Sequence, residues 1–113
     1  MKARNDDLYL YDIEKCCEKI ETYIAGIDYA QFLANPMLQD ALVRNIEIIG
    51  EAAKNLSEDF RTSTPEVVWR DIMRMRDTVV HHYFRLNLEV IWQTAADDIP
   101  KLLLQIREIA KQD

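Results

Sequence analysis

The segment from Arg76 to Tyr83 is the part of the chain best equipped for chemistry. It reads Arg-Asp-Thr-Val-Val-His-His-Tyr, so a guanidinium, a carboxylate, two imidazoles and a phenol fall within eight residues. His81 and His82 are the only histidines in the sequence. Because histidine is the side chain whose ordinary pKa suits proton transfer near neutral pH, we expect acid–base chemistry to be confined to this segment.

A guanidinium and an imidazole together favour chemistry on phosphate esters. Arg76 could bind a phosphate through two parallel hydrogen bonds and stabilise charge that develops on its oxygens. His81 could accept or donate a proton, a contribution typically worth about 10²–10⁴ in rate. RNA needs no more than these groups, since its own 2′-hydroxyl is the nucleophile. Asp77 could orient Arg76 or a histidine of another chain, and Tyr83 could hydrogen-bond the phosphate or stack on a base.

The same residues also have a purely structural interpretation. Arg76 and Asp77 could form a surface ion pair, and His81 or His82 could be a hydrogen-bonded residue of the core or of an interface. Metal binding is disfavoured, because neighbouring helical residues point about 100° apart and no further cysteine or histidine completes a zinc site. The sequence also lacks a glycine-rich phosphate loop, a nucleophile elbow and a two-histidine zinc helix. We therefore predict no metal site.

Helical geometry limits how these side chains can meet. On one helix Arg76 and Tyr83 would share a face, whereas His81 would lie roughly 140° around the axis from Arg76. A straight helix therefore cannot direct all three at one small ligand. They converge only if the helix ends or bends near His81, or if a second copy of the chain completes the site.

The elements expected to position this segment are all helical. A first helix begins at Asp6 or Asp7 and ends near Gly26, because apolar residues recur at steps of three and four: Leu10, Ile13, Cys17, Ile20, Ile24 and Ile27. A short helical turn is expected within residues 28–35. Asn35 and Pro36 then form a helix start signal, and the second helix runs to about Leu56.

Ser57–Ser63 is interpreted as a polar connection, and Thr64-Pro65-Glu66 as the start of a third helix that carries Arg76 to Tyr83 towards its C-terminal end. A fourth helix, capped by Asn87, is expected from Leu88 to about Lys111, with a kink at Pro100. Its apolar residues are expected to face inward: Ile91, Ala95, Ile99, Leu102, Leu103, Ile106 and Ile109. Four amphipathic helices with short links predict an all-α fold, an antiparallel four-helix, up-and-down bundle that forms one domain over residues 1–113.

Composition supports a globular domain of this kind. The 113 residues are 49% hydrophobic and 30% charged, with a net charge of −6, which argues against a protein that coats nucleic acid non-specifically. Between residues 61 and 85, however, five arginines stand against three acids. The adjacent Cys16 and Cys17 match neither disulfide nor zinc spacing. Without a signal peptide or a membrane-length apolar run, we predict a cytoplasmic protein not associated with membranes.

The second helix carries a charged line formed by Arg44, Glu47 and Glu51. It is either a solvated face with intrahelical ion pairs or a line placed at a subunit interface or beside His81. Gly50, in the middle of this helix, predicts the close approach of another helix, because glycine there otherwise costs about 1 kcal/mol.

The pattern Arg76-x4-His81-x-Tyr83 resembles the signature of the HEPN superfamily, in its branch of HepT-like toxins. The resemblance extends over nearly the whole chain through the blocks Arg44–Ala53, Trp69–Ile72 and Asp98–Leu102 and the neighbours of the motif. It implies a HEPN-like helical bundle and a dimeric, metal-independent ribonuclease without cofactor, in which two motif helices line one cleft. RNA, with transfer RNA as one candidate, would be cut as an endo- or exonuclease.

The resemblance also implies roles and partners. Arg76 and His81 would be catalytic, with Asp77, which is often Asn in relatives, and Tyr83 supporting. The chain would be the toxin of a type VII-like toxin–antitoxin pair, silenced when a minimal nucleotidyltransferase antitoxin transfers AMP to Tyr83. A homodimer is also suggested by a surplus of apolar positions, namely Met73, Val79, Phe84 and Trp92. The alternative is a non-catalytic helical module that binds nucleotide or the nucleotidyltransferase.

Overall fold

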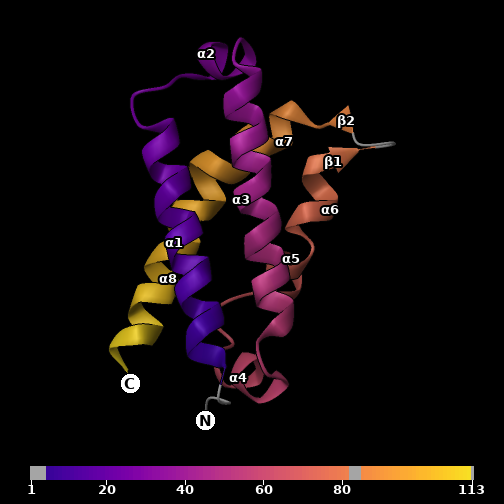
Figure 1. Ribbon diagram of the computed structural model, residues 1–113. Coiled ribbons are helices and arrows are strands. Elements are labelled where there is room, and N and C mark those ends of the chain that lie inside the picture. Colours follow the sequence, from indigo (N-terminus) through magenta and orange to yellow (C-terminus); the bar gives the residue numbers. More distant parts are fainter. Residues whose placement is uncertain (1–4, 82–84, 113) are drawn as a thin grey trace.

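The computed structural model describes residues 5–81 and 85–112, and residues 80 and 81 for their backbone alone. The helices group in chain order into four rods, described below. The rods run up and down beside one another, and the first helix begins at the end of the molecule where the last helix ends (Figure 1). The all-α bundle predicted from the sequence is confirmed. The part of the chain that is described contains one departure, a pairing of two two-residue strands.

The first two rods form the centre of the bundle. Helix α1 spans Asp6–Ile24 and helix α3 spans Pro36–Asn55, with the short helix α2, Tyr29–Leu33, between them. Asn35 caps α3 as predicted, since its side chain accepts a hydrogen bond from the backbone N–H of Leu38 at 3.0 Å. In α2 only Phe32 is buried, while Tyr29 and Leu33 remain exposed.

The buried faces are those that the apolar spacing predicted. The fully buried apolar side chains of α1 belong to the predicted stripe, and those of α3 recur at the same helical spacing: Ile13, Cys17 and Ile20, then Leu42, Ile46, Ile49 and Ala53. Cys16 and Cys17 are both buried and free. Burial raises the pKa of the Cys17 thiol to about 12, so Cys17 serves as a small core residue and not as a nucleophile.

The interpretation of Ser57–Ser63 as a polar connection was wrong, since Glu58–Ser63 forms helix α4. Ser57 caps it by accepting from the backbone N–H of Phe60 at 3.1 Å. Thr64 does not start the next helix but ends this one, because its hydroxyl donates to the carbonyl of Phe60 at 2.9 Å. The same hydroxyl accepts from the Trp69 indole N–H at 2.9 Å.

The third rod is therefore shorter and more broken than predicted. It begins at Trp69 as helix α5, Trp69–Met73, and continues as helix α6, Met75–Val79. The chain then leaves the helical conformation and forms strand β1, Val80–His81, which pairs antiparallel with strand β2, Arg85–Leu86. The single third helix running through Tyr83 was wrong in this respect.

The fourth rod consists of helix α7, Leu88–Gln93, a π-helical turn η1, Thr94–Asp98, and helix α8, Ile99–Lys111. Asn87 caps it as predicted. Pro100, which lacks a backbone donor, lies in the first turn of α8 directly after the π-helical turn, so the irregularity precedes the proline. The predicted inner residues of this rod are all buried: Ile91, Ala95, Ile99, Leu102, Leu103, Ile106 and Ile109.

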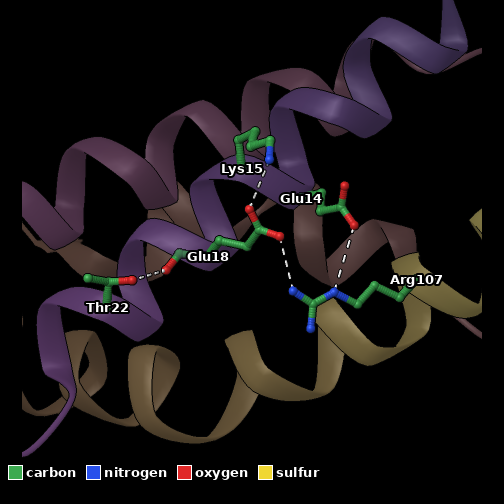
Figure 2. A network of polar contacts seen from close by, with 5 residues as sticks. All are labelled: Glu14, Lys15, Glu18, Thr22 and Arg107. Carbon is green, nitrogen blue, oxygen red and sulfur yellow. Dashed lines mark hydrogen bonds and ion pairs between the residues drawn. The ribbon is translucent and has the colours of Figure 1, made fainter.

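A polar clamp joins the first and last rods. Arg107 of α8 reaches between two carboxylates of α1 (Figure 2), with its Nη2 3.0 Å from Glu18 Oε2 and its Nε 3.8 Å from Glu14 Oε2. Lys15 also contacts Glu18, at 3.2 Å. The guanidinium thus lies between two acids of the neighbouring helix.

Candidate active site

The break in the third rod places the motif residues on two different elements. Arg76 lies in α6, whereas the backbone of His81 lies in β1, two residues after the helix ends at Val79. The hairpin is closed on its helical side, because the Asn87 backbone N–H donates to the Val79 carbonyl at 2.9 Å. The helix end near His81 that the geometry allowed is present, and completion of the site by a second copy of the chain stays a prediction.

Arg76 is held by a residue of another helix. Its Nε donates to Glu47 Oε2 of α3 at 3.1 Å, across 29 positions of sequence. The side chains of Arg76 and Glu47 are 52% and 34% exposed. The terminal nitrogens Nη1 and Nη2 of Arg76 make no hydrogen bond to any described residue. Two parallel donors of a guanidinium therefore remain available for an anion.

The close approach predicted at Gly50 explains how α3 and the third rod come to share this contact. A Cβ on Gly50 would lie 3.4 Å from the Ile72 carbonyl oxygen and 3.5 Å from that of Met73. The backbone of α3 therefore contacts the end of α5 directly. Arg76 follows three residues after Met73, one helical turn from this contact, and Glu47 precedes Gly50 by three residues on the same helix.

A cavity of about 350 Å³ opens beside Arg76. Its walls come from α1, α3 and α6 and carry charged, polar and aromatic groups: Tyr9, Asp12, Arg44, Glu47, Ile48, Glu51, Ala52, Asn55 and Arg76. The charged line of α3 thus faces this cavity. No intrahelical ion pair joins Arg44, Glu47 and Glu51 in the described part of the chain. Arg44 and Glu51 are exposed and Glu47 pairs with Arg76, so the line is a solvated face next to Arg76, and its place at a subunit interface or beside His81 stays a prediction.

The opposite side of α6 faces a second cavity of about 470 Å³. Met75 and Thr78 line it together with residues of η1 and α8, among them Thr94, Asp98 and Lys101. Burial and the nearby Asp97 carboxylate raise the pKa of Asp98. Arg76 does not line this cavity, so the short helix α6 presents its arginine to the α3 side alone.

Asp77 does not take the role that sequence reasoning gave it. It is exposed, and no ion pair or hydrogen bond links its carboxylate to Arg76 in the described structure. The predicted surface pair of Arg76 with Asp77 is replaced by the pair with Glu47. A role of Asp77 towards a histidine of a second copy stays a prediction.

Three of the predicted site side chains are not described by the structure. His82 and Tyr83 lie outside the described residues, and His81 is described for its backbone alone. Phe84, one of the four apolar residues on which a dimer was argued, also lies outside them. Of the other three, Val79 is fully buried, while Met73 and Trp92 pack against the core. These three are thus accommodated within one protomer.

Glu47 is the site residue that sequence reasoning named without assigning a role. Two features of the sequence pointed to it. Glu47 belongs to the charged line of the second helix, and Gly50 in the same helix predicted the close approach of another element. Within the described residues, no group of three or more histidines, cysteines or carboxylates is arranged to hold a metal ion. None of the described helices is long and apolar enough to cross a membrane.

The all-α bundle, with Arg76 near a helix end and the backbone of His81 just beyond it, agrees with the HEPN-like bundle that the resemblance in sequence implies. The sequence model of the family "Ribonuclease HepT-like" matches residues 13–109. The chain belongs to this family.

Curated relatives agree with this assignment. A protein of Caldanaerobacter subterraneus subsp. tengcongensis named "Putative RNase" is 41% identical over 105 residues, which cover 93% of this chain and 94% of the relative. The "Probable ribonuclease HepT" of Thermococcus cleftensis is 40% identical over 98% of this chain and 100% of its own length. A "Putative RNase" of Methanocaldococcus jannaschii is 39% identical over 98% of this chain and 92% of its own length. No solved structure matches the chain significantly.

Proposed function

We propose that this protein is a metal-independent ribonuclease that acts as the toxin of a toxin–antitoxin pair, with Arg76 and His81 as its catalytic residues. One observation carries the proposal. In a chain of the ribonuclease HepT-like family, the motif arginine is anchored through Nε, its terminal nitrogens make no hydrogen bond to the described residues, and it lies beside an open cavity with the motif histidine just beyond the helix end.

The proposed reaction uses the substrate's own nucleophile. The 2′-hydroxyl oxygen attacks the adjacent phosphorus, the bond from phosphorus to the 5′-oxygen breaks, and a 2′,3′-cyclic phosphate and a free 5′-hydroxyl result. The 2′-hydroxyl proton leaves to a base and the 5′-oxygen gains a proton from an acid, so the protons balance. Arg76 stabilises the charge on the non-bridging oxygens, and His81 transfers protons.

A homodimer completes the site in this proposal. Each chain has two histidines, and His81 is the one at the motif position. Two copies that face one another across their α6 ends would bring two imidazoles to one cleft, one to accept a proton and one to donate it. The cognate nucleotidyltransferase would silence the enzyme by transferring AMP to Tyr83, which adds a bulky anion close to Arg76.

The test compares the wild type with Arg76→Ala and His81→Ala, with Arg107→Ala as the matched control from the clamp between α1 and α8. We expect growth arrest and RNA cleavage to be lost in the first two variants and retained in the control. Intact mass should show AMP increments on the protein only after co-expression with the nucleotidyltransferase, and not in Tyr83→Phe. Undiminished cleavage by both Arg76→Ala and His81→Ala would refute the assignment.

A further inference from the structure

The contact between Arg76 and Glu47 restricts the motion of the Arg76 guanidinium. An arginine side chain has several rotatable bonds, and it loses rotamer freedom when it is fixed. Arg76 stands on a helix of only five residues that ends three positions later. Without an anchor, its guanidinium would sample many positions above the cavity.

The anchor comes from a rigid part of the molecule. Glu47 lies in the middle of α3, a helix of 20 residues whose inner face is buried in the core. The Gly50 contact, 3.4 Å from Cβ position to carbonyl, fixes the separation of α3 and the third rod one turn away. The backbone position of Glu47 is therefore set independently of whether Arg76 binds its carboxylate.

The nitrogen of Arg76 that donates to Glu47 determines which of its other nitrogens can still bind a phosphate. Glu47 accepts from Nε and not from the terminal nitrogens. A guanidinium anchored at Nε still presents Nη1 and Nη2 side by side, the pair of donors that matches two oxygens of one phosphate. A contact that blocked phosphate binding would be expected to occupy that pair.

We infer that Glu47 is a positioning residue for the ribonuclease reaction, which holds Arg76 through Nε so that its terminal nitrogens meet the phosphate undergoing cleavage. This inference rests on the proposed function for its catalytic consequence. The contact itself is a property of the free protein and can be tested without any cleavage.

Kinetics separate positioning from a structural role. We expect Glu47→Ala to lower kcat by roughly 10- to 100-fold, since small misplacements of a catalytic group cost that much, with a smaller change in KM. Glu47→Gln keeps an oxygen that can accept from Nε, and it should restore kcat to within a few-fold of the wild type. Asp40→Ala is the matched control. It removes an exposed carboxylate of the same helix, two turns from Glu47 and outside the cavity.

Chemical rescue gives a second readout that a structural role would not move. Guanidinium at low millimolar concentration should restore part of the activity of Arg76→Ala, because Glu47 remains to hold the free cation. The rescue should be lost in the double variant with Glu47→Ala and kept in the double variant with Asp40→Ala, with potassium chloride at matched ionic strength as the blank. Rescue that is independent of Glu47 would overturn the inference.

The side-chain Nε–H signal of Arg76 tests the contact directly by ¹H–¹⁵N NMR. Its assignment follows from its disappearance in Arg76→Lys. We expect slow exchange with water in the wild type and in Asp40→Ala, and fast exchange in Glu47→Ala. If exchange is the same in all three proteins, or if Glu47→Ala cleaves RNA faster than the wild type, Glu47 does not position Arg76. If no form of the protein cleaves RNA while the exchange pattern holds, the proposed function fails and the anchoring stands.

Discussion

Two arginines of this protein reach across to a neighbouring helix, and they do so differently. Arg107 joins α8 to α1 and lies between two carboxylates, Glu14 and Glu18 (Figure 2). Arg76 joins α6 to α3 and contacts one carboxylate through Nε alone. Their side chains are 46% and 52% exposed, so exposure does not distinguish them.

The two arginines differ in how many acids of the protein balance each guanidinium. The charge of Arg107 is balanced by two acids on one helix, and a third group, Lys15, shares Glu18. The terminal nitrogens of Arg76 bond none of the described residues and lie at the edge of a cavity. The first arrangement joins two helices, whereas the second holds a cation ready for an anion that the protein itself does not supply.

The largest loss of RNA cleavage is expected from replacing Arg76, and not Arg107, by lysine. Lysine keeps the charge but loses the planar set of parallel donors. Arg76→Lys should therefore reduce RNA cleavage by about 10²-fold or more, while Arg107→Lys retains cleavage. Single-turnover cleavage of one RNA by both variants measures this, with circular dichroism as the check on folding. Equal losses of cleavage in the two variants would show that Arg76 has no catalytic role that Arg107 lacks.

A smaller loss of activity is expected when a large side chain at Gly50 pushes α3 and the third rod apart, whereas a small one should be tolerated. Gly50→Ala places its Cβ in ordinary contact with the Ile72 carbonyl at 3.4 Å, and alanine gains about 1 kcal/mol of helix propensity. It should leave cleavage unchanged. Gly50→Leu does not fit between the backbones, so it should lower the free energy of unfolding by about 1–3 kcal/mol.

Because Gly50→Leu pushes Glu47 and Arg76 apart, it should also lower cleavage by roughly tenfold. Cleavage and thermal melting of the two Gly50 variants, compared at a temperature where both are folded, test this. Wild-type cleavage by a folded Gly50→Leu protein would show that the spacing of the helices does not matter for Arg76.

The sequence predicted the rods better than the connections between them. Helices α1 and α3 have long apolar stripes, and Asn35 with Pro36 starts α3 as expected. The segment after α3 was misread, because capping signals compete. Thr64 before Pro65 is typical of a helix start, yet its hydroxyl bonds the Phe60 carbonyl and the Trp69 indole and so closes α4 instead.

The candidate site was predicted in part for a similar reason. Local spacing identified Arg76 and His81. Geometry required either a helix end or bend near His81 or a second copy of the chain, and the structure has the helix end. The partner of Arg76 was predicted as its neighbour Asp77, because sequence proximity is the simplest guide to ion pairs. Glu47 is 29 residues away. Only the packing of α3 against the third rod, permitted by Gly50, brings it there.

A further and smaller effect concerns anion binding by the free protein. Inorganic phosphate should raise the melting temperature of the wild type and of Arg107→Ala, because a ligand that binds only the folded state stabilises it. Arg76→Ala should show no phosphate-specific increase over sodium chloride at equal ionic strength. Differential scanning fluorimetry across a phosphate titration measures this. A shift that persists in Arg76→Ala would place the anion elsewhere.

The smallest effect is expected at the clamp, and it should depend on pH. Hydrogen bonds from Arg107 and then Lys15 lower the pKa of Glu18 below its ordinary value of 4.5. A carboxyl whose folded pKa is depressed contributes stability above its unfolded pKa and loses it as the pH falls through the folded pKa.

Arg107→Ala should thus be slightly less stable than the wild type at neutral pH. The gap should close below pH 4.5 and also shrink in high salt, since the charges are exposed. In a Glu18→Gln background the acid-dependent part of the gap should be smaller, because the nearer of the two carboxylates beside Arg107 is gone. Urea unfolding at several pH values measures all four proteins. A gap that stays constant down to acid pH would show that Arg107 acts through packing of its carbon chain and not through its charge.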